Sequence, residues 1–391
     1  MPPRSPAPRL SFYYAAYFGA VGVFLPFWPV WLSERGLSAP EIGFLIAAAT
    51  GLRVLTNPLI AQAADRGGER KRLMGLLSGL AIIAFLFFQG AHGFWPILLV
   101  TLFFFTFWSA TQPLAESLTM LGVGADKLDY GRIRLWGSIT FIITSIGLGW
   151  FLTGRGADLI YSAALAGIVI TFVSCLMLPG YKAPASGPHR LALWPVIRNV
   201  RFMVFLFAVG LIQASHAVLY GFGTIHWRSA GYSDGVIGLF WAEGVFAEII
   251  LFAFGAYLMR RFGAIGLVLL GGLAGVIRWG AMGVEGGIYW IVIMQSLHAF
   301  TFGATHLGAM HFITETVAPS HSASAQAIYA AFVAGIAMGI ASFFSGLLYA
   351  QFGGQAYFAM AAAAAAGSLI ATAYLFRDRF LRANDTRQKG P

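Results

Sequence analysis

Residues 316–376 read TVAPSHSASAQAIYAAFVAGIAMGIASFFSGLLYAQFGGQAYFAMAAAAAAGSLIATAYLF and contain no formally charged side chain. A helix needs about 20 predominantly apolar residues to cross the hydrocarbon core of a bilayer. The stretch is therefore long enough for two crossings, and Gln351-Phe352-Gly353-Gly354 predicts the turn between them. Its apolar residues run continuously instead of alternating, which favours helices over a β-barrel.

Uncharged stretches of this kind recur along the rest of the chain, which predicts an all-α membrane protein with twelve transmembrane helices. The predicted ranges are 10–33, 41–64, 73–90, 94–120, 132–153, 158–179, 202–228, 236–259, 264–283, 287–313, 324–349 and 356–376. The first range follows Arg4 and Arg9 and so imitates a signal peptide. It is too long and too aromatic for one, and we interpret it as the first helix.

The composition excludes several classes of protein. Only 10% of the 391 residues are charged and 58% are hydrophobic, whereas a soluble globular chain carries roughly a quarter charged residues. Cys175 is the only cysteine, and no Cys/His spacing resembles a zinc site, so we expect no metal and no cofactor. The sequence has no Walker loop, Asp-rich metal motif or plausible Ser/His/Asp set, which argues against a membrane enzyme or a primary pump.

The positions of the basic residues predict the orientation. Loops on one side carry 20 Lys and Arg, and loops on the other carry only Arg35, Arg155 and Arg228. The positive-inside rule then places both termini in the cytoplasm, for a multi-pass protein of the cytoplasmic (inner) membrane. The net charge of +10 is thus a topology signal and indicates no nucleic-acid partner. The expected partners are the lipid bilayer, a small organic solute and protons, and we expect a monomer.

An internal repeat predicts two halves. Residues 36–43 (GLSAPEIG) resemble residues 231–238 (GYSDGVIG) at an offset of 195, and the same offset relates Gly68 to Gly263. Six helices separate the copies, so the repeats run parallel, as in one known transporter architecture. We therefore expect an N-terminal six-helix half (1–179), a cytoplasmic linker (180–201) and a C-terminal six-helix half with a cytoplasmic tail (202–391).

The segment ADRGGERKR (64–72) resembles the loop 2–3 signature of the major facilitator superfamily. Ala61 stands where that signature opens with Gly, and the second copy has Met259 where an acid could stand, so we expect an asymmetric charged gate. A narrower resemblance, to the phenylpropionate permease branch, rests on LPFWPVWLSERGLSAPEIG, GLRVLTNPLIAQAADR, DYGRIRLWGS, AEIILF and LHAFTFGATHLGAMHFI. It implies the major facilitator fold and proton-coupled uptake of a small organic solute. The predicted gating or structural residues are Asp65, Arg66, Gly68, Arg70, Arg132, Arg134, Glu243 and Arg278.

Five ionisable residues lie inside predicted spans, where charges are costly and mark function by default. Glu243 and Arg278 lie in the outer thirds of their helices, and we interpret them as a structural pair. Arg53 and Glu248 lie near mid-span and are 195 positions apart. Arg53 is a natural bidentate ligand for a carboxylate, and we expect Glu248 and a substrate carboxylate to compete for it. Glu116 is the predicted proton carrier.

Four helices show narrow polar or aromatic faces. The resemblance implies that helices one, four, seven and ten line the central cavity of the family. The aromatic face of helix one (Tyr13, Tyr17, Phe24, Phe27, Trp31) is interpreted as packing. The predicted substrate-binding residues are Arg53, Asn57, Trp108, Gln112, Gln213, His216, Tyr220, Gln295, Phe302 and His306. His298 and Glu248 are the alternative proton carriers to Glu116.

The sequence therefore predicts a secondary transporter that imports a small aromatic carboxylate together with protons by alternating access. A proton-coupled nucleoside or sugar symporter is the main alternative. A drug/proton exporter fits less well, because cation exporters usually benefit from an acidic cavity and Arg53 is a cation. An integral membrane enzyme is the alternative from another class.

Overall fold

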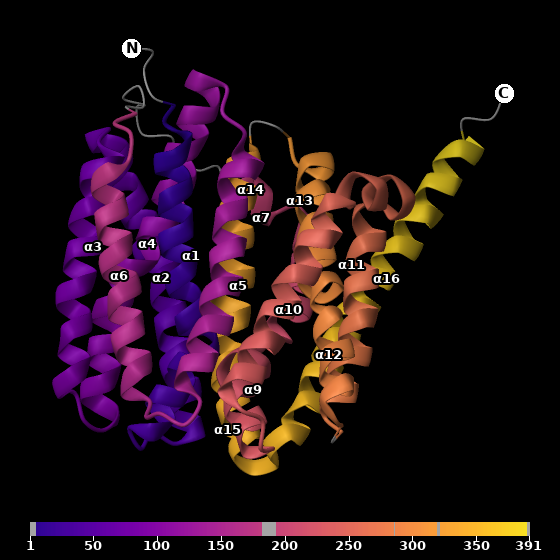
Figure 1. Ribbon diagram of the computed structural model, residues 1–391. Coiled ribbons are helices and arrows are strands. Elements are labelled where there is room, and N and C mark those ends of the chain that lie inside the picture. The colour runs from indigo at the N-terminus through magenta and orange to yellow at the C-terminus, as the bar shows by residue number, and fades with distance from the viewer. Residues whose placement is uncertain (1–4, 182–192, 285, 319–320, 389–391) are drawn as a thin grey trace. The chain divides into compact units, whose positions relative to one another are not determined.

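The computed structural model describes residues 5–181, 193–284, 286–318 and 321–388, except for the side chains of 323 and 375–388. Within these ranges the chain forms helices joined by short turns, with no strand (Figure 1). It divides into two compact units. Unit 1 comprises 1–189 and 219–246, and unit 2 comprises 190–218 and 247–391. Residues 219–246, which the repeat assigns to the second predicted half, thus cluster with the first.

Unit 1 contains the first six predicted spans. Its helices are α1 (Ala7–Glu34), α2 (Ala39–Gly67), α3 (Arg70–Leu86), the short 3-10 segment η1 (Phe87–Gly90), α4 (Phe94–Asp126), α5 (Tyr130–Leu152) and α6 (Asp158–Met177). Helix α1 packs against α5 and α6, and α4 packs against α2 and α3. Small residues permit the close approach. A Cβ atom on Gly22 would overlap the Thr144 side chain of α5, and one on Gly167 would lie 2.9 Å from Ala20 Cβ.

The remaining helices belong to unit 2, except where α9 and α10 enter unit 1. They are α7 (Leu193–Ile197), α8 (Val200–Ala214), α9 (Ala217–Ser229), α10 (Asp234–Ala253), α11 (Gly255–Met282), α12 (Ile288–Ser296), η2 (Ala299–Ala304), α13 (Thr305–Thr316), α14 (Ser322–Tyr329), η4 (Ala330–Ala337), α15 (Met338–Phe352), η5 (Gly353–Ala356) and α16 (Tyr357–Gln388). The segments η2 and η4 are π-helical. Helix α11 packs on α13 and α16, and α8 packs on α16.

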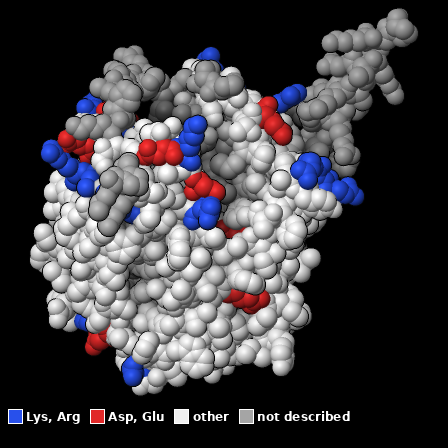
Figure 2. All heavy atoms as spheres, turned by 45° about the horizontal axis from the view of Figure 1, so that its top comes forward, with Lys and Arg blue, Asp and Glu red and all other residues white. Residues whose placement is uncertain are grey.

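Ten of the described helical runs are long and apolar enough to cross a membrane. The difference from the twelve predicted spans has two causes. The predicted span 287–313 is divided by η2 into pieces too short to qualify, and the predicted spans 324–349 and 356–376 form one helical run, Ser324–Tyr374. Most of the surface in Figure 2 belongs to uncharged residues, and large apolar side chains such as Leu55 are two-thirds exposed. Such a surface suits lipid and not water.

The repeat found in the sequence has a structural counterpart. Gly36 and Gly231 adopt φ values of 85° and 86°, in the left-handed region that favours glycine. Each follows a helix and is followed by a 6→1 hydrogen bond, from Leu37 N to Leu32 O and from Tyr232 N to Trp227 O. Gly68 and Gly263 likewise share φ 66°. The same turns therefore recur at the same offset. The boundaries of the predicted halves stay a prediction.

The predicted linker is described at its two ends, and residues 182–192 lie outside the described part. At its start the Tyr181 hydroxyl donates to Asp126 Oδ2 beyond the end of α6. Burial, with this hydrogen bond as a second cause, raises the pKa of Tyr181. At its end Asn199 caps α8 by accepting a hydrogen bond from Phe202 N at 3.1 Å. The start of the linker is thus attached to the end of α4, and its end is attached to α8.

Candidate functional site

Arg53 lies at the middle of α2, on the face predicted from the sequence. Its Nη2 donates to Thr50 Oγ1 at 3.0 Å, three residues earlier on the same helix. Within the described residues no carboxylate forms an ion pair with it. The same face reaches α4 at Asn57, whose Oδ1 accepts a hydrogen bond from Ser109 Oγ at 3.0 Å. Arg53 is thus a fixed cation that has a hydroxyl partner but no anionic one in the described part of the chain.

A group of stacked aromatic rings lies beside Arg53. Arg53 interacts electrostatically with Tyr17 of α1. The Tyr17 ring is stacked on Trp108 of α4, with centroids 4.9 Å apart and planes at 14°. Trp108 also stacks on Phe104 at 5.9 Å. Flat aromatic faces of this kind bind other rings by offset stacking. The predicted residues Arg53, Asn57 and Trp108 therefore belong to one region of unit 1.

Tyr13, Phe27 and Trp31, the rest of the predicted face of α1 apart from Phe24, are almost fully buried. They contribute to the core of unit 1 and show no polar function. This agrees with their interpretation as packing residues.

Glu116 of α4 accepts hydrogen bonds from three donors and lies near one arginine. Its Oε2 accepts hydrogen bonds from the hydroxyls of Tyr14 at 2.8 Å and Tyr130 at 2.7 Å. Its Oε1 accepts one from Gln112 Nε2 at 3.0 Å, and Arg134 Nε lies 3.9 Å from it. The pairing with Gln112 follows from the i, i+4 spacing, but the two tyrosines were missed. They come from α1 and α5, so the carboxylate joins three helices.

The second cluster of charged residues lies in unit 2. Arg278 of α11 is completely buried and donates through Nη2 to Gln295 Oε1 at 2.6 Å. Its Nη1 lies 3.2 Å from His298 Nδ1. On the other side of the imidazole ring, His298 Nε2 lies 3.7 Å from Glu248 Oε2. The imidazole of His298 thus stands between a buried guanidinium and a carboxylate.

His216, another predicted residue, joins the same cluster through Thr301 of η2. Its Nε2 lies 3.0 Å from Thr301 Oγ1, which also accepts a hydrogen bond from Arg278 Nη1 at 2.9 Å. Sequence reasoning missed Thr301, because a threonine in an apolar helix carries no signal of its own.

The other predicted residues have varied positions. Gln213 donates through Nε2 to the Phe302 carbonyl at 3.3 Å, and the Phe302 ring stacks between those of His298 and His306. His306 Nδ1 lies 3.4 Å from the Tyr329 hydroxyl. Tyr220 belongs to unit 1 and stacks on Trp241. Arg53 and Glu248, and likewise Glu243 and Arg278, belong to different units, so both predicted pairings stay predictions.

The predicted gate residues of unit 1 form a compact arrangement around the turn between α2 and α3. Gly68 ends α2 in the left-handed region. Arg70 is buried, donates to Asp65 Oδ1 at 2.5 Å, and reaches Ser117 Oγ of α4 at 2.9 Å. Arg66 and Arg132 are exposed, and the described residues include no ion-pair partner for either. Arg134 lies with its guanidinium carbon 3.7 Å from the ring centroid of Phe18.

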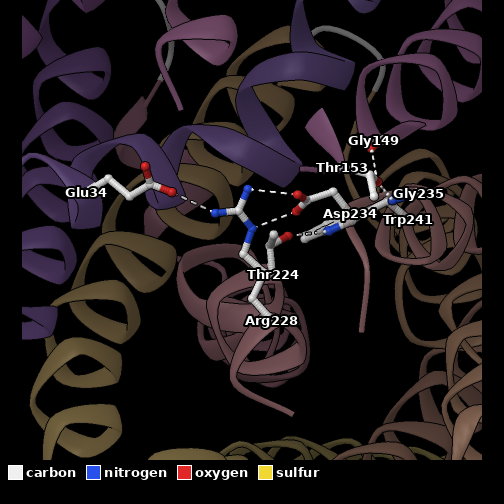
Figure 3. Close-up of polar contacts among 8 residues, drawn as sticks. All are labelled: Glu34, Gly149, Thr153, Thr224, Arg228, Asp234, Gly235 and Trp241. Carbon is white, nitrogen blue, oxygen red and sulfur yellow. Dashed lines mark hydrogen bonds and ion pairs between the residues drawn. The ribbon is translucent and has the colours of Figure 1, made fainter. Parts of the chain in front are cut away.

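A further charged cluster was missed by the sequence reasoning (Figure 3). Arg228 of α9 binds both oxygens of Asp234, at 2.6 and 3.0 Å, and Glu34 of α1 at 2.8 Å. Beside it, the carbonyl of Asp234 touches Gly149 of α5, where a Cβ atom would overlap it. Arg228 had been counted only as a topology signal. All four residues lie in unit 1.

Metal binding finds no support within the described ranges, where no group of three or more His, Cys, Asp or Glu side chains could hold an ion.

Comparisons with known proteins agree with this architecture. Residues 8–360 match the model of the MFS_1 like family. The chain is 36% identical over 362 residues to a probable 3-phenylpropionic acid transporter of Escherichia coli (strain K12), covering 90% of this chain and 93% of that protein. It is 25% identical over 329 residues to a maltose permease of Geobacillus stearothermophilus, covering 82% of each. A crystal structure of a variant of the nucleoside transporter NupG superposes with a TM-score of 0.84 at 16% identity, covering 94% of this chain and 99% of that one.

Proposed function

The chain belongs to the MFS_1 like family, and on that premise we propose that it imports a small aromatic carboxylate together with protons by alternating access. It is a multi-pass membrane transporter with the all-α major facilitator fold, and it is not an enzyme. The proposal also concerns the identity of the solute, the residues that carry the proton, and the membrane, oligomeric state and orientation of the protein. We place the protein as a monomer in the cytoplasmic membrane, with both termini in the cytoplasm.

The observation that carries the carboxylate proposal is the position of Arg53. A cation in a spanning helix is costly unless an anion neutralises it, and no described carboxylate pairs with this one. A guanidinium binds a carboxylate through two parallel hydrogen bonds. The stacked rings of Tyr17 and Trp108 lie beside it and suit the flat apolar body of an aromatic acid. The 3-phenylpropionic acid named for the Escherichia coli relative combines these two chemical features.

Glu248 and His298 are the proton carriers that the geometry supports best. The two side chains face each other at 3.7 Å, and Arg278 reaches the far nitrogen of the imidazole. A small approach of the two side chains would bring them within hydrogen-bonding distance, at which a proton can pass between the carboxylate and the imidazole. Movement of Arg278 would change the electrostatic environment of both His298 and Glu248.

Glu116 remains the second candidate. Two tyrosines and one glutamine already donate to its oxygens, and Arg134 lies close by. Protonation of Glu116 would replace an accepting oxygen with a donating one and break at least one of these bonds. We therefore propose that Glu116 chiefly holds α1, α4 and α5 together, and that Glu248 and His298 carry the proton.

A binding assay with an aromatic acid and its amide tests the carboxylate proposal. We expect the purified protein to bind 3-phenylpropionate far better than 3-phenylpropionamide, and Arg53→Gln to remove the preference. Arg53→Lys keeps the charge but loses the bidentate geometry, so it should retain only part of the preference. Arg155→Gln is the matched control, because Arg155 is an exposed loop arginine that donates only to the Phe151 carbonyl. Equal binding of acid and amide by the unaltered protein would contradict the proposal.

That result would instead favour a neutral solute such as a nucleoside or a sugar. The fold likeness to a nucleoside transporter and the identity to a maltose permease give this alternative its support. Asn57, Gln112 and Gln213 could bind hydroxyl groups, since amides both donate and accept hydrogen bonds. The readout would be binding of a nucleoside or disaccharide that persists in Arg53→Gln.

A further inference from the structure

The Thr301 side chain connects the buried histidine His216 with Arg278, which in turn reaches His298. It lies in the π-helical segment η2 (Ala299–Ala304) and is fully buried. Its hydroxyl oxygen is 2.9 Å from Arg278 Nη1 and 3.0 Å from His216 Nε2. A π-helical turn inside an α-helix frequently marks a functional position. The role of this threonine follows from the direction of its hydrogen bonds.

The His216 ring fixes the direction of the first bond. Its Nδ1 lies 2.9 Å from the carbonyl oxygen of Gln213, which can only accept. In the neutral ring Nδ1 therefore carries the hydrogen, and Nε2 accepts. The Thr301 hydroxyl has two acceptors in reach, His216 Nε2 at 3.0 Å and the His298 carbonyl at 3.4 Å, and the shorter contact favours His216 for its single hydrogen. Its lone pairs remain for Arg278, so Thr301 accepts from Arg278 and donates to His216.

Arg278 fixes the His298 ring in the same way. A guanidinium has only donors, so His298 Nδ1 at 3.2 Å must accept. The hydrogen of the neutral His298 ring is therefore on Nε2, the nitrogen that faces Glu248 at 3.7 Å. While Arg278 occupies Nδ1, no proton can bind there. The same Nη1 nitrogen serves both Thr301 and His298, while Nη2 donates to Gln295 Oε1 at 2.6 Å, so the hydroxyl and the amide together position the guanidinium.

We propose that Thr301 is a positioning residue, whose hydroxyl holds Arg278 against His298 Nδ1 and thereby directs the Nε2 hydrogen of His298 toward Glu248. The significance for transport rests on the proposed function of Glu248 and His298 as proton carriers. Among the described residues, the charged and titratable groups in contact with the His298 ring are Arg278 from α11, Glu248 from α10 and His216 from between α8 and α9, whose ring centroid lies 5.5 Å away. Loss of the hydroxyl leaves Arg278 Nη2 bound to Gln295 but removes the contact that holds Nη1 beside His298 Nδ1.

The test is nitrogen-15 NMR of histidine-labelled protein at neutral pH, with the His298 signals assigned by their loss in His298→Gln. The unaltered protein should show His298 neutral, with its hydrogen on Nε2. Thr301→Val keeps the shape but removes the hydroxyl, and should populate a form of His298 with hydrogen on Nδ1. Thr301→Ser should retain the original spectrum. If Thr301→Val does not fold, Thr301→Ala is measured by the same criterion.

Thr305→Val is the matched control, because Thr305 is equally buried on the next turn and its hydroxyl reaches only the Phe300 carbonyl at 3.4 Å. An unchanged His298 spectrum in Thr301→Val, or the same change in Thr305→Val, would overturn the inference. Transport is measured separately. In proteoliposomes Thr301→Val should lose most gradient-driven accumulation but keep solute exchange. If Glu248→Gln and His298→Gln both accumulate solute normally, the proposed proton carriers fail while the NMR result on Thr301 still stands.

Discussion

Glu34 and Arg228 form an ion pair with Oε1 and Nη1 2.8 Å apart, although 194 positions separate them in the chain. At the repeat offset of 195, position 34 corresponds to 229 and position 228 to 33. The two residues therefore lie at equivalent helix ends of the two copies, immediately before the matching glycine turns at Gly36 and Gly231. The ion pair joins one copy of the repeat to the other. Neither side chain is repeated at the corresponding position, where the other copy has a serine.

Removing the arginine should destabilise unit 1. Arg228→Ala leaves Asp234 without its bidentate partner, and the side chain of Asp234 is only 11% exposed. Leaving a buried hydrogen-bonded group unpaired costs about 1–3 kcal/mol. We expect a lower melting temperature in detergent for Arg228→Ala. Glu34→Gln, which removes only the more exposed partner, should change it little. Equal melting of the Ala variant and the unaltered protein would contradict this.

Close packing of α5 against α10 should also depend on a single glycine. A Cβ atom on Gly149 would overlap the carbonyl oxygen of Asp234, which cannot rotate away. Gly149→Ala is therefore expected to lower the melting temperature. Gly147→Ala lies on the same helix with open space at its Cβ position, and removing a mid-helix glycine gains about 1 kcal/mol in helix propensity. Opposite signs for the two variants confirm the contact, and equal effects exclude it.

The proposed proton carriers predict a separation of two transport modes. Glu248→Gln cannot release a proton, so we expect it to exchange solute across a liposome membrane but not to accumulate it with a proton gradient. Under the proposed assignment Glu116→Gln should keep part of its accumulation, because its amide still accepts a hydrogen bond from one of its partners. Loss of accumulation in Glu116→Gln with normal accumulation in Glu248→Gln would reverse the two assignments.

The basic-residue asymmetry predicts the side of the membrane. A cysteine at position 186, introduced by Ser186→Cys, should stay unlabelled by an impermeant thiol reagent in intact cells and become labelled after permeabilisation. Cys175 is buried and gives little background. A cysteine at Arg155, in a loop predicted to be outside, is the positive control. Ready labelling of position 186 in intact cells would invert the orientation.

Much of the helical framework could be predicted from the sequence, because uncharged length determines it directly. The predicted range 10–33 corresponds to Ala7–Glu34, and 132–153 to Tyr130–Leu152. The repeat found in the sequence recurs in the structure as glycine turns with matching φ values. The break in the seventh predicted span, between Ala214 and Ala217, could not be predicted. No proline or glycine marks it, and the residues there pack on their surroundings.

The candidate sites could be predicted only where the contacting residues lie on one helix. Helical spacing revealed the bond between Gln112 and Glu116, because both lie on one helix. It could not reveal Tyr14 and Tyr130, which reach Glu116 from other helices, since their contact depends on how those helices cross. Arg278 was predicted to lie inside a span, but its described partners Gln295, His298 and Thr301 come from α12, η2 and the residues between them, so these contacts also depend on how the helices cross.

The three-way contact at Arg228 has a consequence for reversibility. Asp234 and Arg228 belong to neighbouring helices of the same copy and are linked by two hydrogen bonds, whereas Glu34 comes from α1 of the other copy and is about half exposed. If α1 withdraws, the guanidinium keeps its nearer anion and no isolated charge is left behind. The pair that breaks is of the exposed kind, worth roughly 0–1 kcal/mol. Thermal motion is therefore enough to break and re-form the ion pair between Glu34 and Arg228 in every transport cycle. No separate energy source is needed for it.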